Sequence, residues 1–198
     1  TVICPTCFRE MNPRIQRFKV NGILATALYE YTERAKGIIY NFKGCFDYEL
    51  REVFLLRQKS YLKIKYRNWI IIPAPSFKEK DKERGFNHVM EMFRILGLPI
   101  VEALIKNSDI KQANLKKKNR EEVAHYLEWN NSVDINGKNI LFVDDILTTG
   151  NTAKAACDLI MKHKPKKLEI LIGFHVKDNR HFNFFERFKR SFVAYDLS

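Results

Sequence analysis

The feature that most constrains this chain is the segment 140–152, Ile-Leu-Phe-Val-Asp-Asp-Ile-Leu-Thr-Thr-Gly-Asn-Thr. Its first four residues are apolar, and so short an apolar run is typical of a buried parallel strand. Asp144 and Asp145 stand where we expect that strand to end. A helix-forming run over 153–161 follows. A strand, a tight turn and a helix in this order predict an α/β fold.

The turn between the strand and the helix has the composition of a phosphate site. A helix start carries unpaired backbone N–H groups and the positive end of the helix dipole, and both attract an anion. Gly150 lets the backbone approach a ligand closely, and the neighbouring hydroxyls can donate hydrogen bonds to phosphate oxygens. The candidate phosphate-binding residues are Thr148, Thr149, Gly150, Asn151 and Thr152.

The two carboxylates need a different role, because they would repel that phosphate. Asp144 and Asp145 could instead accept hydrogen bonds from vicinal sugar hydroxyls, so a phosphorylated ribose would satisfy both halves of the segment. A solvated strand end and an ordinary capped turn explain either half alone. The complete order favours a ligand site.

Composition narrows the class of protein but not its ligand. The chain has 198 residues, 45% of them hydrophobic, which suits one α/β domain with a small appendage. Its net charge of +12 suits nucleic acid, an anionic membrane surface or phosphorylated small molecules without choosing among them. No apolar run reaches the roughly 18 residues of a membrane span, and we recognise no signal peptide. We therefore expect a cytoplasmic protein.

The N-terminal segment contains half of a zinc motif. Cys4 and Cys7 form Cys-x-x-Cys, which could give two thiolates to a tetrahedral zinc ion; in a cytosolic protein this is favoured over a disulfide. Cys45 is a candidate third ligand, and the set is incomplete. The alternative is a remnant of a zinc module. We divide the chain into an N-terminal Cys-x-x-Cys segment, 1–20, and a main domain, 21–198.

Other segments are read from their periodicity. Trp69–Ser76 reads as a strand that ends at Pro73, because proline cannot continue a central ladder. Ligands of open parallel sheets collect at the carboxyl ends of strands, so this end and Asp144 are expected to face one ligand. We expect His88 on a helix surface rather than acting as a base. The remaining expected elements are strands over 23–31, 138–143 and 168–176 and helices over 33–42, 47–62 and 88–96.

Each of three basic stretches can be interpreted either as an ordinary structural segment or as a functional one. Residues 78–84 are either a solvated face or a pyrophosphate-binding run. Residues 111–120 are either a surface loop or a cationic lid that closes over a polyanion. Residues 180–190 interleave basic and aromatic side chains, a pattern that can stack bases and hold a nucleic-acid backbone. For this last stretch we favour packing of the phenylalanines against the domain.

Taken in order, four pieces of the sequence resemble the ComF family, bacterial competence proteins with a phosphoribosyltransferase domain. The resemblance covers roughly residues 23–176, and its most family-specific piece is Arg-Gly-Phe-Asn. The four pieces are Cys4-x-x-Cys7, Ile72-Pro-Ala-Pro75 with Arg84-Gly-Phe-Asn87, Gln112-x-x-Leu115-x-x-x-x-Arg120, and 140–152. Family members usually have a fuller set of N-terminal cysteines than this chain.

The resemblance implies a type I phosphoribosyltransferase fold, a central parallel sheet flanked by helices with a smaller hood. It implies binding of phosphoribosyl pyrophosphate (PRPP) with Mg²⁺. Asp144 and Asp145 would bind the ribose hydroxyls, and 148–152 would wrap the 5-phosphate. The other implied residues are the pyrophosphate loop Pro73, Ala74, Pro75 and Ser76, the flexible loop 107–120 with Lys111, Gln112, Lys116 and Arg120, and the ligand-proximal Arg84 and Asn87.

Two functions remain open. The first is a phosphoribosyltransferase of nucleotide metabolism whose acceptor is an unknown base or amine. The second is a DNA-uptake or DNA-maintenance factor that binds PRPP, in which the partners would be single-stranded DNA, a competence helicase and a recombination mediator. The net charge of +12 and the basic, aromatic C-terminal stretch fit the second function.

Overall fold

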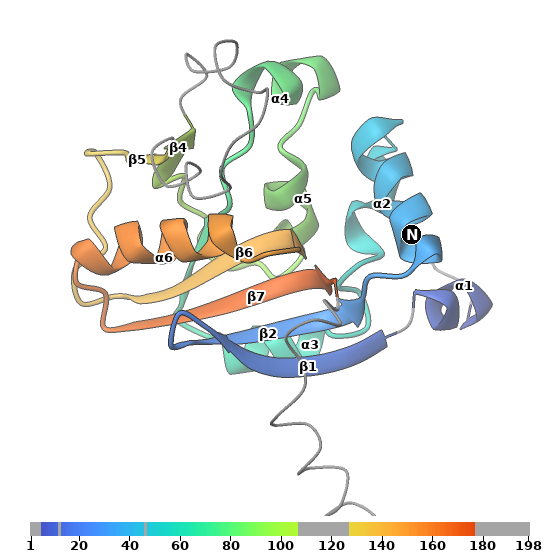
Figure 1. The fold of residues 1–198 in the computed structure, drawn as a ribbon, viewed down its shortest axis with the longest axis horizontal. Helices are drawn as coiled ribbons and strands as arrows, with labels where there is room; N and C mark the ends of the chain where they lie inside the picture. Colours follow the sequence, from blue (N-terminus) through green and yellow to red (C-terminus); the bar gives the residue numbers. More distant parts are fainter. Residues whose placement is uncertain (1–4, 12, 46, 107–126, 177–198) are drawn as a thin grey trace, which may run out of the picture.

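The computed structural model describes residues 5–11, 13–45, 47–106 and 127–176. A five-stranded sheet runs through its centre (Figure 1). The strand order is β1-β2-β7-β6-β3. The strands are β1 Pro13–Val20, β2 Ile23–Glu30, β7 Lys167–His175, β6 Asn139–Leu147 and β3 Ile70–Pro73.

Four of the five strands are parallel, from β2 through β7 and β6 to β3. The fifth, β1, pairs antiparallel with β2 through a two-residue turn, Asn21-Gly22, whose residues both have positive φ. The predicted α/β fold with a central parallel sheet is therefore confirmed, with one antiparallel edge strand added. Since β1 lies within 1–20, part of that segment belongs to the same sheet as the main domain.

Helices cover both faces of the sheet. Successive side chains of a strand point to opposite faces, and both faces of this sheet carry apolar side chains that pack against helices. On one face, Leu141, Val143 and Leu171 pack with residues of the helical segments that connect β2 to β3 and β3 to β4. On the other, Phe142 and Ile172 pack against α6. The first group is α2 Glu33–Gly44, the 3₁₀ helix η1 Tyr48–Glu52, α3 Lys59–Lys65 and α5 His88–Arg94; α6 is Asn151–Lys162.

Four smaller elements complete the described chain. A two-stranded antiparallel sheet, β4 Leu104–Lys106 and β5 Leu127–Trp129, lies beside α6 and forms a small hood (Figure 1). The short helix α4, Lys78–Arg84, lies above α5. Near the N-terminus, α1 spans Pro5–Glu10.

The predicted helix over 47–62 is wrong. The chain there forms η1, a series of turns, and then α3. Val53, Phe54 and Leu55 are all buried, and three consecutive residues cannot share one face of a regular helix. The chain must turn at this point to bury all three.

The other predicted elements are present with small changes of length. The strands predicted over 23–31 and 168–176 are β2 and β7, and the helices predicted over 33–42 and 88–96 are α2 and α5. The strand predicted over 138–143 is β6, but it continues through both aspartates to Leu147. None of the described helices combines the length and the apolar character needed to cross a membrane.

Candidate functional site

The candidate site lies where β6 extends beyond the end of its neighbour β3. The β3 ladder ends at the pair Pro73–Val143, and Ala74 N–H makes one further bond to the Val143 carbonyl, 2.8 Å. Beyond that point β6 pairs only with β7, where Asp144 lies opposite Ile172. One side of β6 is therefore open at the two aspartates, because proline ends the neighbouring strand.

The turn after β6 has the geometry of an anion site. Gly150 has φ 76°, a left-handed conformation that suits glycine, and directly precedes α6. The N-cap residue of α6 is this glycine, which has no side chain to cap the helix, and the first turn of α6 carries no acidic residue. A cavity of about 40 Å³ opens there, lined by Asp144 and residues 146–153. The five predicted phosphate-binding residues, 148–152, are all part of this lining.

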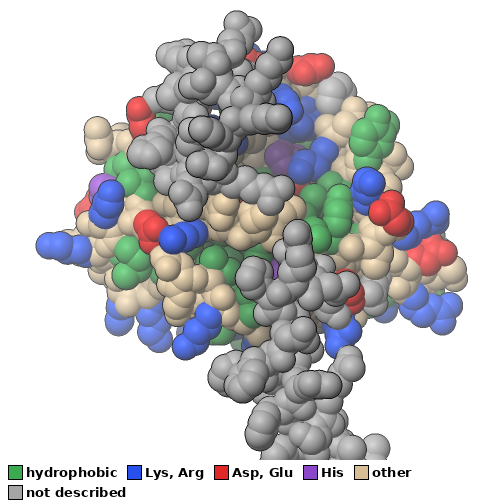
Figure 2. Space-filling model, viewed as in Figure 1, with side chains coloured by type: hydrophobic (Ala, Val, Ile, Leu, Met, Phe, Trp, Pro, Cys, Tyr) green, Lys and Arg blue, Asp and Glu red, His purple; other side chains and the backbone are tan. Residues whose placement is uncertain are grey.

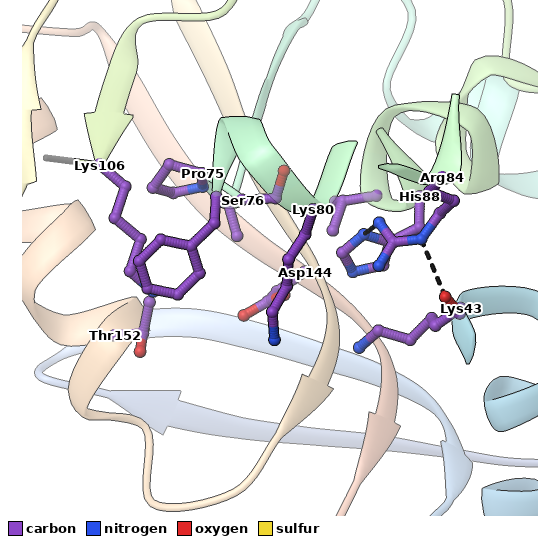
Figure 3. A pocket seen from close by; sticks show the side chains of 12 residues that line it. Lys43, Pro75, Ser76, Lys80, Arg84, His88, Lys106, Asp144 and Thr152 are labelled. Atoms are coloured by element: carbon purple, nitrogen blue, oxygen red, sulfur yellow. Dashed lines mark hydrogen bonds between the residues drawn. The ribbon is translucent and has the colours of Figure 1, made fainter. Parts of the chain in front are cut away.

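A second cavity, of about 270 Å³, adjoins the first, since Asp144 and Thr152 line both. Its other charged or titratable side chains are all basic. They come from four separate elements or loops and surround Asp144 (Figure 3). They are Lys43, Lys80, Arg84, His88 and Lys106. In Figure 2, basic side chains are seen beside a histidine in the upper part of the visible face.

The predicted pyrophosphate loop forms one wall of this second cavity. Ala74, Pro75 and Ser76 line it, together with Phe77. Pro73, the last residue of β3, instead lines a further cavity of about 230 Å³ on the hood side of the loop. The structure thus places 74–76 between the open end of β6 and the hood.

Asp145 is the strongly held member of the carboxylate pair. It is 7% exposed, its Oδ2 accepts from the Lys43 ammonium, and the His88 Nε2 lies 3.4 Å from the same oxygen. Its Oδ1 accepts the backbone N–H of Ile146 at 2.8 Å. Burial alone would raise the pKa of Asp145, but the hydrogen bond from His88 and the charge of Lys43 outweigh it and hold the pKa below its usual range.

Asp144 has the opposite electrostatics. Burial and the negative charge of Asp145 raise its pKa well above the usual range, and Lys43 offsets only part of this. Its Oδ1 accepts the backbone N–H of Asp145 at 2.9 Å. Asp144 therefore lines the cavity as a carboxyl group with too little positive charge nearby to stabilise its ionised form. The neighbouring Asp145, in contrast, is stabilised as an anion.

The predicted surface position of His88 is wrong. His88 is 8% exposed, lies at the start of α5 and contacts Asp145. Helical spacing offered a signal, because His88 precedes the buried Met92 by four residues and so shares its face. Burial lowers the pKa of His88, with Asp145 acting in the opposite direction.

Arg84 and Asn87 were both predicted to lie near the ligand, but only Arg84 lines the basic cavity. The Arg84 side chain is 8% exposed and lines the basic cavity, and its Nε donates to the Lys43 carbonyl at 2.9 Å. Asn87 does not line that cavity. It caps α5 by accepting the Met90 N–H at 3.0 Å, and its Nδ2 donates to Ser76 Oγ at 3.2 Å.

Two lysines of the site, Lys43 and Lys106, were not predicted. Lys43 lies in the last turn of α2, 102 residues before Asp145, so no local pattern could have found it. Lys80 belongs to the run 78–84, for which pyrophosphate binding is one of the two interpretations, and it lines the second cavity. Lys106 ends β4, stacks over the Phe77 ring at 4.1 Å, and has its pKa lowered by burial, against the opposing charge of Asp144.

Several predicted residues lie outside the described part of the chain. These are Lys111, Gln112, Lys116 and Arg120 of the flexible loop, the basic and aromatic stretch 180–190, and Cys4. Cys7 lies in α1, but its side chain is not described, and Cys45 is exposed as a free thiol. Within 5–11, 13–45, 47–106 and 127–176, no cluster of three or more His, Cys, Asp or Glu could hold a metal ion. Zinc at Cys4 and Cys7 stays a prediction.

The sequence matches the model of the phosphoribosyl transferase domain family over residues 82–182. The chain belongs to this family. The matched region contains the Arg-Gly-Phe-Asn segment, α5, the open end of β6 and the turn into α6. The sheet and its flanking helices are accordingly those of a type I phosphoribosyltransferase fold.

The chain is also similar to several individual proteins. "Competence protein ComFC" of Bacillus subtilis (strain 168) is 28% identical over 174 residues, which cover 81% of this chain and 72% of that protein. The predicted resemblance to the ComF family is thereby confirmed. "Bifunctional protein PyrR 1" of Lactiplantibacillus plantarum is 49% identical over 41 residues, covering 20% of this chain and 23% of that one. The crystal structure of a hypoxanthine phosphoribosyltransferase from Staphylococcus aureus has a TM-score of 0.45 and 14% identity, covering 66% of this chain and 75% of that chain.

Proposed function

We propose that this protein binds PRPP at the junction of the two cavities. The observation that carries the proposal is the order of three adjoining environments. The turn at Gly150 leads into the N-terminus of α6, whose helix dipole favours a phosphate, Asp144 lines both cavities, and the second cavity is rich in basic side chains. PRPP has a phosphate, a diol and a diphosphate in that order.

Each part of the ligand would meet a group of matching chemistry. The 5-phosphate would accept hydrogen bonds from the start of α6 and the hydroxyls of 148–152. The ribose hydroxyls would donate to Asp144 and Asp145. The diphosphate would lie against the backbone of 74–76 and the basic cavity, where Lys80 and Lys106 supply positive charge.

Mg²⁺ would bind at this site together with PRPP. Mg²⁺ is commonly held by one or two carboxylates together with substrate phosphates and water. Asp144 is the residue that would face it, since its raised pKa marks a carboxyl group short of counter-charge. When bound, the ion would neutralise part of the diphosphate charge.

The same geometry would suit phosphoribosyl transfer. The bond between ribose C1 and the diphosphate oxygen would break, and the diphosphate would leave with the bonding electrons. The lone pair of an acceptor nitrogen would form the new bond to C1, and that nitrogen would then lose its proton to solvent. The contribution of this chain would be positioning and charge stabilisation, with Asp144 and Asp145 orienting the ring and Lys80 and Lys106 meeting the developing charge of the leaving group.

Titration calorimetry with Mg²⁺–PRPP tests the binding step. We expect saturable binding by the native chain and a loss of at least about 100-fold in affinity, equivalent to about 2.7 kcal/mol, for Asp144→Asn combined with Asp145→Asn. Gly37→Ala is the control substitution, because Gly37 lies in α2, outside the lining of both cavities, and an added Cβ would meet no atom within 4 Å. Equal affinity for the native and doubly substituted chains would refute the assignment.

A role in DNA uptake or DNA maintenance is the second candidate, and it rests on the similarity to a competence protein and on the net charge of +12. In this alternative PRPP would act as a bound regulator rather than a consumed substrate. Release of pyrophosphate with a panel of purine and pyrimidine bases and amines distinguishes the two. Release with one acceptor supports transfer. PRPP binding without release, together with salt-sensitive binding of single-stranded DNA, supports the second candidate.

A further inference from the structure

A chain of hydrogen bonds joins the two parts of the site that would hold opposite ends of the ribose–diphosphate bond. It starts at Ser76 in the loop after β3, whose Oγ donates to Asp81 Oδ2. Asp81 Oδ1 accepts from Arg84 at 3.2 Å. The same Arg84 nitrogen lies 3.0 Å from His88 Nδ1, and His88 Nε2 lies 3.4 Å from Asp145 Oδ2.

The donor and acceptor roles in this chain follow from arginine chemistry. A guanidinium has only donors, so the 3.0 Å contact with Arg84 requires His88 Nδ1 to accept. The proton of the neutral imidazole is then on Nε2, which is the nitrogen that faces Asp145. Burial also favours the uncharged ring, since it lowers the pKa of His88.

Other charged groups near His88 are consistent with a neutral ring. The Lys43 ammonium shares Asp145 Oδ2 with it, so two donors converge on one carboxylate oxygen. Arg84 is also fixed by its bond to the Lys43 carbonyl at 2.9 Å. Around the rest of the cavity lie Asp144, Lys80 and Lys106.

We propose that His88 is a positioning residue of the PRPP site: as the Nε2–H tautomer fixed by Arg84, it orients Asp145 and links it through Asp81 to the loop 74–76. The proposal rests on the proposed function. It explains why a buried histidine bridges a guanidinium and a carboxylate beside the cavity. It also gives the Arg-Gly-Phe-Asn segment a role, because Arg84 and Asn87 both bond to Asp81.

Two substitutions separate positioning from packing. In His88→Gln, the amide can accept from Arg84 through its oxygen and donate to Asp145 through its nitrogen, so the chain of bonds survives. In His88→Leu, a side chain of comparable size keeps the packing but has neither group. His163→Leu is the control for loss of a histidine, because His163 stacks on Trp129 away from the cavity.

The readouts are the Mg²⁺–PRPP dissociation constant, the melting temperature and the ligand-free imidazole ¹⁵N spectrum. We expect His88→Leu to weaken PRPP binding about 10-fold, the size of one lost hydrogen bond to a charged group. His88→Gln should stay within about 3-fold of the native affinity, and the control should bind normally. The spectrum should show a bare Nδ1 and a protonated Nε2 at neutral pH. If His88→Leu binds normally, or if His88→Gln loses as much affinity as His88→Leu, the positioning role is overturned.

A failure of the proposed function would look different. If the native chain does not bind PRPP, the site assignment is wrong, and the chain of bonds is then judged by the ¹⁵N spectrum of the ligand-free protein. A ring protonated on Nδ1 alone overturns it, because Arg84 could not donate to such a nitrogen. Should His88→Leu not fold, His88→Gln and the spectrum still decide.

Discussion

Replacing the two aspartates one at a time should change the stability of the protein in opposite directions. Asp145 accepts from Lys43, His88 and a backbone N–H. Asp144 is a carboxyl group whose pKa is raised by burial and by its neighbour. Asp145→Asn should therefore destabilise the fold, and Asp144→Asn should stabilise it.

The magnitudes follow from the interactions lost. Asp145→Asn removes charge-assisted hydrogen bonds, worth about 1.5–3 kcal/mol. For a chain of this length that lowers the melting temperature by roughly 3–12 °C. Asp144→Asn removes an unfavourable charge, and stabilising single substitutions commonly give about 0.5–2 kcal/mol, so the melting temperature should rise by roughly 1–8 °C.

The pH dependence gives each effect a distinct sign. A raised folded-state pKa means that the native Asp144 binds its proton more tightly than the unfolded chain does, so its cost grows as pH rises above the unfolded value of about 3.9. The lowered pKa of Asp145 contributes stability above that value, which is lost as pH falls. Both variants should thus differ most from the native chain near neutral pH and converge on it in acid.

Differential scanning calorimetry at about pH 7.5 and about pH 3, which is below the pKa of the unfolded carboxyl groups, measures both trends. The reasoning is refuted if the two variants shift the melting temperature in the same direction at neutral pH. It is also refuted if the difference between them grows in acid. Both variants should bind PRPP more weakly, so Asp144→Asn would gain stability while losing function.

Two further predictions concern packing and thiol reactivity. In Gly173→Ala, the new Cβ would lie 2.8 Å from the Asp145 carbonyl oxygen and overlap a methionine side chain of α5. We expect Gly173→Ala to lower the free energy of unfolding by about 1–3 kcal/mol in calorimetry and to weaken PRPP binding. Gly37→Ala is the control and should not destabilise the protein, because an added Cβ there meets no neighbouring atom. An unchanged melting temperature for Gly173→Ala would contradict this packing. Cys45 is exposed, whereas burial raises the pKa of the Cys157 thiol to about 12. In a dithionitrobenzoate assay, Cys45→Ser should therefore remove a fast-reacting thiol, and Cys157→Ser should not. Loss of a fast phase in Cys157→Ser would be inconsistent with the burial of this thiol.

Local sequence carried the predictions that succeeded. The residues 140–152 are contiguous, so their strand, turn and helix could be read from one segment, and the lining of the small cavity follows from them. The alternation and length of the apolar runs likewise predicted β2 and β7. These features depend on backbone preferences and burial patterns that act over a few residues.

The predictions that failed depended on contacts between distant segments. The helix predicted over 47–62 failed because Val53, Phe54 and Leu55 are all buried in one core, whereas three consecutive residues of a regular helix do not share a face. Lys43 reaches Asp145 because α2 packs in the same core as β6, although the two residues are 102 positions apart in the sequence. The buried position of His88 combines a polar residue with an apolar helix face, and a polar residue at a helix start is ordinarily read as exposed.

A crystal structure of the protein with Mg²⁺ and PRPP tests the central claim most directly. The account predicts the 5-phosphate at the turn 148–152, the ribose hydroxyls at Asp144 and Asp145, and the diphosphate against 74–76 among the basic side chains of the second cavity. His88 should still lie between Arg84 and Asp145 in that complex. PRPP bound elsewhere, or bound with its 5-phosphate in the basic cavity, would contradict the account.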